Sequence, residues 1–199
     1  MRKANKSDKD KVVKIICESF NKNPHLNYIV KSDRKRNKRM AYLAEYAFNM
    51  GLKRDGVYLS DDERGVAIVY QNSKVKPNFS NCLSQLKLGF KVFSPFRIVS
   101  ICKLESRIKF NRESEGDFLY CWFLGVENSA LGTHTAWELM KNIFELSEKC
   151  NLPIQVETSL KRNNIIYQRF GFENYNILRT HKGDLTFWFM KRPVMPKAS

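Results

Sequence analysis

Apolar and polar residues follow each other along the chain with spacings that indicate helices in some segments and strands in others. After a short strand expected at the N-terminus, the first apolar residues recur at helical spacing: Val12, Ile15, Ile16 and Phe20. Ser7 and Asp10 fit a capping box at the start of this helix. Pro24 then breaks the pattern within the stretch NKNPHLNYIV.

A second helix is expected to begin near Ser32 or Asp33 and to end before Gly56. One of its faces carries the apolar residues Met40, Leu43, Ala47 and Met50. Two short strands follow at 57–60 and 65–71. The polar turn DDER between them predicts a hairpin.

Residues 80–112 have helical spacing and are expected to form an insertion between two strands. Its first apolar face comprises Leu83, Leu86 and Phe90. Ser94 and Pro95 suit a second helix start, with serine as the cap and proline at the first helical position. The apolar residues expected to continue that helix are Phe96, Val99, Cys102 and Ile108.

The second half of the chain alternates strands with helices. Residues 117–126 are nearly all apolar, which is typical of a strand covered on both faces. An amphipathic helix at 134–149, a buried strand at 153–159 and a short helix at 162–171 follow. Two strands joined by HKG close the chain. This order predicts an α/β fold of the α+β kind, a mixed sheet with helices on its faces.

Composition limits the kinds of protein that this chain can be. Its 199 residues are 43% hydrophobic, which suits a single folded domain over 1–199, with the helical insertion at 72–116. No run of about eighteen apolar residues predicts a membrane span, and MRKANKSDKDK lacks the apolar core of a secretory signal. Five widely spaced cysteines without a CxxC argue against a disulfide framework or zinc site. We therefore expect buried thiols in a reducing cytoplasm.

The charge is strongly basic, with a net charge of +15 and a pI near 9.7. This favours an anionic partner such as nucleic acid, an acidic surface or a phosphate-rich cofactor. Six basic residues stand among the nine from Lys31 to Arg39. We interpret this run as the solvated first turns of the second helix, because a nucleic-acid site usually adds exposed aromatic residues or glycines.

The order of elements and two motifs resemble the GNAT N-acetyltransferase superfamily. FLGVENSALGTHTAWELM stands where that family has its fourth strand, pyrophosphate loop and following helix. PIQVETSLKRNNIIYQRFGFE stands where it has its fifth strand, an asparagine and a Tyr-x-x-x-Gly-Phe helix end. This second motif looks like the puromycin N-acetyltransferase branch. The resemblance covers roughly residues 2–192 and is strongest over 117–192.

The resemblance implies a GNAT-like acyl-CoA N-acyltransferase fold that binds acetyl-CoA as cosubstrate and has no metal. Leu124, Gly125 and Val126 would hydrogen-bond the pantetheine arm through their backbones, and one backbone N–H would stabilise the oxyanion. The pyrophosphate would lie at the start of the 134–149 helix, where unpaired N–H groups and the helix dipole favour an anion. The loop residues concerned are Leu131, Gly132, Thr133, His134, Thr135 and Ala136.

Two positions of that loop depart from the family pattern, which reads Gln/Arg-x-x-Gly-x-Gly/Ala. Leu131 replaces the polar first residue, and His134 replaces the glycine that lets the backbone approach the phosphate. A β-carbon is tolerated at residue 134 if the backbone there is helical, and is strained if it is left-handed. The imidazole could also fill the phosphate site or donate to a phosphate.

The resemblance also implies catalytic residues. Tyr167 would protonate the departing CoA thiolate, and Asn163 would contact the pantetheine; Tyr167 could instead only pack its helix on the sheet, and Asn163 could only cap it. The acceptor ammonium must lose a proton before attack. Glu157, at the end of the fifth strand, is the first candidate base and Glu127 the second.

Other residues near the expected site have weaker support. Tyr120 and Cys121 alternate on the fourth strand, and either one could line the acceptor site or only the core. His25 and Tyr28 lie in a loop that borders the acceptor in the family.

The activity predicted from these residues is acetyl transfer from acetyl-CoA to a primary amine by direct attack on the thioester. The acceptor would be a small molecule or a peptide, and the protein a cytoplasmic monomer or homodimer without a membrane partner. Trp188 in the last strand could pair two subunits. The alternative is a GNAT-like domain without turnover that binds nucleic acid, ribosomes or a protein.

Overall fold

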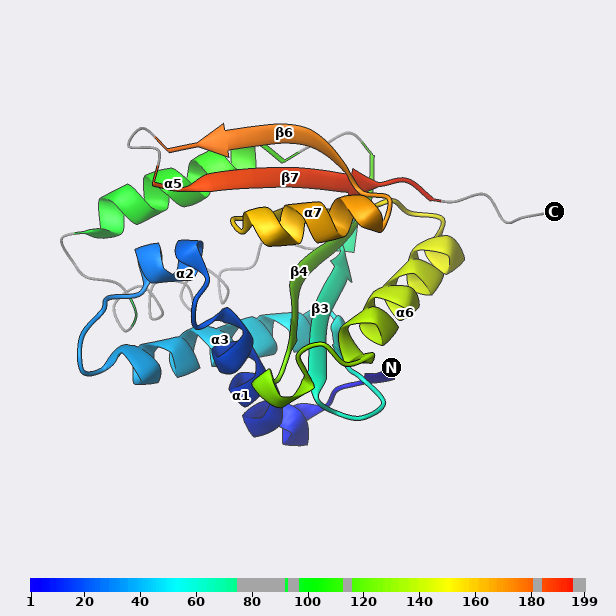
Figure 1. Ribbon diagram of the computed structural model, residues 1–199, viewed down its shortest axis with the longest axis horizontal. Coiled ribbons are helices and arrows are strands. Elements are labelled where there is room, and N and C mark those ends of the chain that lie inside the picture. The colour runs from blue at the N-terminus through cyan, green and yellow to red at the C-terminus, as the bar shows by residue number, and fades with distance from the viewer. Residues whose placement is uncertain (75–91, 93–96, 113–115, 181–183, 195–199) are drawn as a thin grey trace.

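The computed structural model describes residues 1–74, 92, 97–112, 116–180 and 184–194. Its centre is a seven-stranded sheet with the order β1-β2-β3-β4-β5-β7-β6 (Figure 1). The strands are β1 (Arg2–Lys3), β2 (Val57–Leu59), β3 (Gly65–Gln71), β4 (Leu119–Val126), β5 (Ile154–Thr158), β6 (Glu173–Arg179) and β7 (Thr186–Arg192). β4 and β5 are parallel, and the other neighbouring strands are antiparallel. The mixed sheet and the hairpin over the polar turn DDER are as predicted.

Helices cover both faces of the sheet (Figure 1). α1 (Lys9–Phe20) and α3 (Arg36–Lys53) pack on one face of β2, β3 and β4, around a cluster that includes Ile15 and Phe48. α6 (Thr135–Cys150) and α7 (Lys161–Arg169) cover the other face, around a cluster that includes Leu139 and Val156. Because β4 lies between these two clusters, both of its faces are buried, as its apolar sequence predicts.

The N-terminal region differs from the sequence prediction in two details. The capping box is formed by Asn5 and Asp8 around the short 3-10 helix η1 (Lys6–Asp8), so the prediction of Ser7 and Asp10 was wrong. Pro24 does not only break the pattern, since it opens a further helix, α2 (Pro24–Ile29). Asn23 caps that helix by accepting from the Leu26 N–H, and proline is favoured at a first helical position because it has no N–H to satisfy.

The helical insertion is described in its first and last parts, by η2 (Asn72–Lys74) and α5 (Ile98–Phe110). α5 packs on β6 and β7 through Leu104 and Ile108. The predicted apolar face was wrong at Val99 and Cys102, which are exposed, because the buried stripe runs through Ile101, Leu104 and Ile108. The other residues named for this insertion, among them Leu83, Leu86, Phe90, Ser94, Pro95 and Phe96, lie outside the described residues.

The cysteines are less uniformly buried than predicted. Cys121 is buried and Cys17 partly buried, whereas Cys102 and Cys150 are exposed near the ends of helices; Cys82 lies outside the described ranges. The local apolar pattern does not distinguish buried from exposed cysteines, because an exposed helical position can still have apolar neighbours three or four residues away. Within the part of the chain that the structure describes, no helix is long and apolar enough to cross a membrane.

Candidate functional site

β4 and β5 lie side by side at their beginnings and then part. Their parallel pairing covers Leu119 with Ile154, Tyr120 with Gln155 and Cys121 with Val156, and it stops there although β4 continues to Val126. A β-bulge lies at the same level, because Ile68 pairs with Phe123 and Val69 with Cys121, leaving Trp122 without a partner. Since a bulge bends its strand and increases the local twist, it accounts for the separation of β4 from β5.

The open edge of β4 presents backbone groups to the resulting gap. The Glu127 N–H donates to Arg64 O at 2.8 Å, which fixes the alternation of the β3–β4 ladder. Gly125, two residues earlier, therefore directs its N–H and C=O toward β3, and Leu124 and Val126 direct theirs toward the gap. The one Ser19 hydroxyl hydrogen can go to Val126 O or to Ile15 O, each at 2.7 Å, and no group in the described ranges occupies the Leu124 N–H and C=O or the Val126 N–H.

Gly125 has a separate reason to be glycine. A β-carbon at this position would lie 2.5 Å from Ser19 Oγ and 2.7 Å from Ser19 Cβ. The missing side chain lets α1 approach β4 closely. That approach also allows the Ser19 hydroxyl to reach the backbone of Val126.

Tyr167 lies on the α7 side of the sheet, next to Cys121 at the last paired position of β4 and β5. Both residues belong to the core cluster beneath α6 and α7, and the Tyr167 ring packs on Phe172 at a centroid distance of 5.2 Å. Burial, with the neighbouring Cys121 thiol, raises the pKa of Tyr167, and burial raises the pKa of Cys121 to about 12. Both groups stay protonated at neutral pH, so the Tyr167 hydroxyl can act as a proton donor.

Glu157 lies just past the parting point, and an arginine holds it. Arg112 Nε and Nη2 donate to the two carboxylate oxygens at 2.8 Å each, and the two side chains are 28% and 18% exposed. The Arg112 guanidinium also lies over the Tyr120 ring at 4.4 Å. The Tyr120 hydroxyl is buried and makes no hydrogen bond of normal geometry to the described residues. Burial, then Glu157, raises the pKa of Tyr120 well above its ordinary value.

The predicted phosphate loop turns at Gly132, which has a φ of +80°. His134 is the N-cap of α6 with φ −69° and ψ −16°, a right-handed helical conformation that a β-carbon does not strain. Its imidazole lies on Trp137 at a centroid distance of 4.6 Å, one turn further along α6. Leu131 is 66% exposed, so the leucine that replaces the polar opener is not part of the core.

An acidic residue stands beside the first turn of α6. Thr135 Oγ1 donates to Asp62 Oδ2 at 2.6 Å, and Thr133 Oγ1 lies 3.0 Å from Thr135 Oγ1. Burial acts to raise the pKa of Asp62, but hydrogen bonds from Ser60, Thr135 and the Arg64 N–H lower it below its ordinary value. Asp62 is therefore a carboxylate at neutral pH, next to the predicted pyrophosphate position.

The two asparagines of α7 have different roles. Asn164 is buried and donates to Asn174 Oδ1 on β6 at 2.7 Å, which fixes α7 to the sheet. Asn163 is partly exposed and makes no side-chain hydrogen bond to the described residues. Leu160 occupies the N-cap position, so neither asparagine caps the helix.

The other residues predicted for the site, Glu127, His25 and Tyr28, contact side chains outside the gap. Glu127 pairs with Lys14 at 3.0 Å. His25 and Tyr28 lie on α2; His25 contacts Glu105 at 2.8 Å, and the Arg97 guanidinium lies over the Tyr28 ring at 4.6 Å. Across the described ranges, no three His, Cys, Asp or Glu side chains gather as a metal site.

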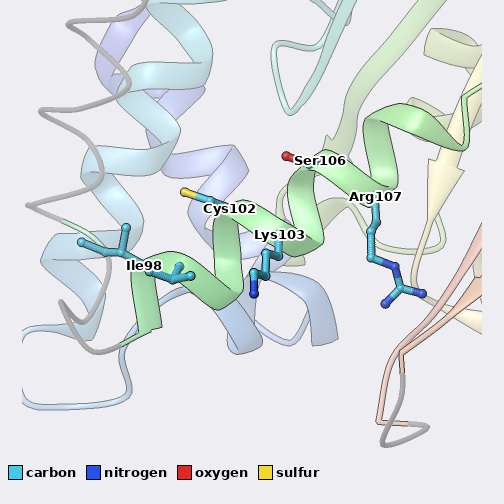
Figure 2. A pocket seen from close by; sticks show the side chains of 6 residues that line it. Ile98, Cys102, Lys103, Ser106 and Arg107 are labelled. Atoms are coloured by element: carbon cyan, nitrogen blue, oxygen red, sulfur yellow. The ribbon is translucent and has the colours of Figure 1, made fainter.

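A shallow hollow lies on α5, away from this gap (Figure 2). Its lining comes entirely from that helix: Ile98, Val99, Cys102, Lys103, Ser106 and Arg107. None of these residues belongs to the predicted site.

Sequence patterns missed three residues of the site. Asp62 lies in a polar turn, Arg112 follows a helix of the insertion, and Arg54 ends α3, where its guanidinium lies over the Tyr70 ring at 4.2 Å. No spacing along the chain connects these residues to β4 or to each other. The folded sheet places Asp62 beside Thr135 at the start of α6, and it places Arg54 and Arg112 at the other end of β3, over Tyr70 and Tyr120.

Comparison with known proteins finds the fold but no sequence family. No protein-family model matches the sequence, and no curated protein matches it. The histone acetyltransferase HPA2-related acetyltransferase from Corynebacterium glutamicum matches with a TM-score of 0.68 and 17% identity, over 99% of this chain and 97% of its own. Arylalkylamine N-acetyltransferase 2 from Aedes aegypti matches with a TM-score of 0.66 and 16% identity, over 98% of each chain.

A third solved structure is the NatC complex bound to Gag peptide and CoA, which matches with a TM-score of 0.52 and 12% identity, over 96% of this chain and 93% of that one. At such identities the similarity concerns the fold. The chain thus has the GNAT acetyltransferase fold, a mixed α/β fold with a seven-stranded, mostly antiparallel sheet. The closer likeness to the puromycin N-acetyltransferase branch stays a prediction from the sequence.

Proposed function

We propose that this protein is an N-acetyltransferase that moves the acetyl group of acetyl-CoA to a primary amine. The observation that carries the proposal is the gap between β4 and β5, which begins after the Cys121–Val156 pair and has a protonated tyrosine, Tyr167, beside its start. The fold is that of acetyltransferases, and solved neighbours include an arylalkylamine acetyltransferase and a complex with CoA.

The pantetheine arm would lie along β4 and bond the backbone groups of Leu124 and the Val126 N–H, with Asn163 reaching it from α7. The pyrophosphate would lie at the loop Leu131–Ala136 and the first turn of α6, where N–H groups and the helix dipole favour an anion. The helical backbone of His134 supports this arrangement, because the histidine leaves the first turn of the helix intact.

In the proposed reaction the amine nitrogen attacks the thioester carbonyl, and a backbone N–H of β4 stabilises the oxyanion. The C–S bond then breaks, the sulfur takes a proton from the Tyr167 hydroxyl, and the second proton that the attacking nitrogen loses restores that hydroxyl. Glu157, on the opposite face of the sheet, is the proposed acceptor of the ammonium proton. Both of its oxygens accept from Arg112, so the proton would go to a carboxylate lone pair that Arg112 does not occupy.

Thermal unfolding with and without acetyl-CoA tests the proposal first, in moderate salt. A ligand at 100 times its dissociation constant adds about 2.7 kcal/mol. For a domain of this size that is roughly 5–10 °C. We expect that shift in the wild type and a similar shift in His134→Gly, since the backbone there is already helical. No shift in the wild type, together with salt-sensitive binding to RNA, would instead support a binding module without turnover.

Tyr167→Phe separates chemistry from binding. It removes only the hydroxyl, so the acetyl-CoA shift should persist while kcat falls about 100-fold. Tyr175→Phe is the matched control, because Tyr175 donates to Gln155 on the other face of the sheet. Equal kcat values for wild type and Tyr167→Phe would remove Tyr167 from the mechanism.

A further inference from the structure

Arg54 is a half-buried cation that forms no ion pair with the described part of the chain. It ends α3, and its guanidinium lies 4.2 Å from the centroid of the Tyr70 ring and 5.7 Å from that of Trp122. No described carboxylate pairs with it, whereas Arg39 pairs with Asp33 and Arg112 with Glu157. The guanidinium is held against the Tyr70 side chain, partly by a hydrogen bond to it, and no described carboxylate takes up its other N–H groups. A guanidinium can bind a carboxylate with two parallel hydrogen bonds.

Arg54 belongs to a row of stacked side chains that leads to the gap between β4 and β5. The Tyr70 and Tyr120 rings are neighbours on adjacent strands, with a centroid distance of 5.6 Å. Arg112 lies over Tyr120 and holds Glu157 at the parting point. This row, from Arg54 through Tyr70, Tyr120 and Arg112 to Glu157, lies on the α1 and α3 face, opposite Tyr167.

The Tyr120 hydroxyl is a second, independent sign of a ligand in this row. Tyr120 is 3% exposed, and its hydroxyl makes no hydrogen bond of normal geometry to the described residues, although Glu157 lies nearby and the ring is well packed. A buried polar group without a hydrogen bond is destabilising by about 1–3 kcal/mol, so native structures seldom keep one that neither protein, water nor ligand satisfies. As a neutral phenol it would donate to a ligand oxygen.

The charges of the row favour an anionic group. Arg54 and Arg112 carry two positive charges and Glu157 one negative charge, which leaves one positive charge unbalanced. An ammonium compound without an acidic group would be repelled by this excess positive charge. An amine with a carboxylate would place its nitrogen at the gap and its carboxylate on the excess charge.

We propose that the acceptor is a primary amine that also carries a carboxylate, with Arg54 binding the carboxylate and the Tyr120 hydroxyl donating to it. This inference rests on the proposed acetyl transfer and names its substrate class. It makes Arg54 and Tyr120 specificity-determining residues on the acceptor face of the sheet. Glu157 and Tyr167 keep their proposed roles in proton transfer.

The test compares the twenty standard L-amino acids, each with the amine that lacks its carboxyl group, by thiol release from acetyl-CoA. We expect the best carboxylated acceptor to exceed its partner at least 10-fold in kcat/KM. Arg54→Gln should lower kcat/KM about 10-fold or more for that acceptor and leave the decarboxylated amine unchanged. Tyr120→Phe keeps the ring and should lower kcat/KM several-fold, again only for the carboxylated acceptor.

Lys141→Gln is the matched control, since Lys141 also lies over an aromatic ring, that of Trp137, but on α6. Lys141→Gln should leave kcat/KM unchanged for both acceptors. A wild type that uses decarboxylated amines equally well or better, or an Arg54→Gln variant that loses both acceptors equally, would overturn the inference. Melting temperatures of all variants without ligand identify any that fail to fold.

Calorimetric titration with L-phenylalanine and 2-phenylethylamine, without acetyl-CoA, separates this inference from the proposed function. Binding of the amino acid that is lost in Arg54→Gln supports the carboxylate site even if no transfer occurs. Acetyl-CoA binding and transfer without any preference for a carboxylate would keep the proposed function and refute the substrate class. No binding of either compound, together with no transfer to any amino acid, would refute the site itself.

Discussion

Arg112 binds Glu157 through two parallel hydrogen bonds, from Nε to Oε2 and from Nη2 to Oε1, each 2.8 Å long. The pair lies on the α1 and α3 face of the sheet, at the point where β4 leaves β5. A carboxylate held by two hydrogen bonds keeps its orientation, and each oxygen retains a lone pair that the arginine does not occupy. The strength of this pair therefore bears on both stability and turnover.

The Arg112–Glu157 pair should have a large coupling energy. A double-mutant cycle with Arg112→Met and Glu157→Gln should give about 2 kcal/mol in chemical denaturation, less than for a fully buried pair because both side chains keep some exposure. The Lys141–Glu145 pair on the surface of α6 is the control and should give at most about 0.5 kcal/mol. Equal coupling in the two pairs would contradict this account.

Gly125→Ala should destabilise the protein through a steric clash. The new methyl group would lie 2.5 Å from Ser19 Oγ, and the Ser19 bond to Val126 O would have to change. We expect a loss of about 1–3 kcal/mol in the free energy of unfolding. Ser19→Gly in the same chain should restore part of it by removing the atoms that clash. A Gly125→Ala protein as stable as the wild type would show that α1 can move away from β4.

Asp62→Asn should tighten acetyl-CoA binding. The Asp62 carboxylate accepts a hydrogen bond from Thr135 and so brings a negative charge to the first turn of α6, where the proposed pyrophosphate would lie. Asparagine keeps an oxygen for the hydrogen bond and removes the repulsion, so affinity should rise about 3–10-fold at low salt and less at high salt. Calorimetric titration measures this, with Asp10→Asn on α1 as the control. An unchanged affinity would place the pyrophosphate elsewhere.

Asp8 should make stability depend on pH at the acid end. Hydrogen bonds from Arg2, then from the Asn5 N–H, lower the pKa of Asp8 to about 2 from its ordinary 3.8. The folded state therefore binds fewer protons, so the contribution is complete above pH 3.8 and disappears as the pH falls through about 2. The melting-temperature difference between wild type and Asp8→Asn should shrink over that range. The same trend with Asp10→Asn would attribute the effect to net charge and contradict a role for the Arg2 and Asn5 contacts.

Much of the fold follows from local sequence. Apolar runs locate β3 and β4, which are covered on both faces, and helical spacing locates α1, α3 and α6, because burial acts on the same residues that the pattern identifies. The errors lie where several local choices satisfy the same pattern. Asn5 and Ser7 are both capable caps, and on α5 either of two apolar stripes could face the sheet.

The sequence over 117–192 was enough to predict the fold and to select Tyr167, Glu157 and the loop 131–136 as candidate site residues, because these residues are close together in the chain. The sequence did not predict which hydrogen bonds and ion pairs these candidate residues form. The helical backbone of His134, the bond between Glu157 and Arg112 and the carboxylate of Asp62 at α6 depend on residues that meet only when the sheet forms. Long-range contacts of this kind carry no periodic signal, so the tertiary structure alone decided which groups at the gap are free and which already have a partner.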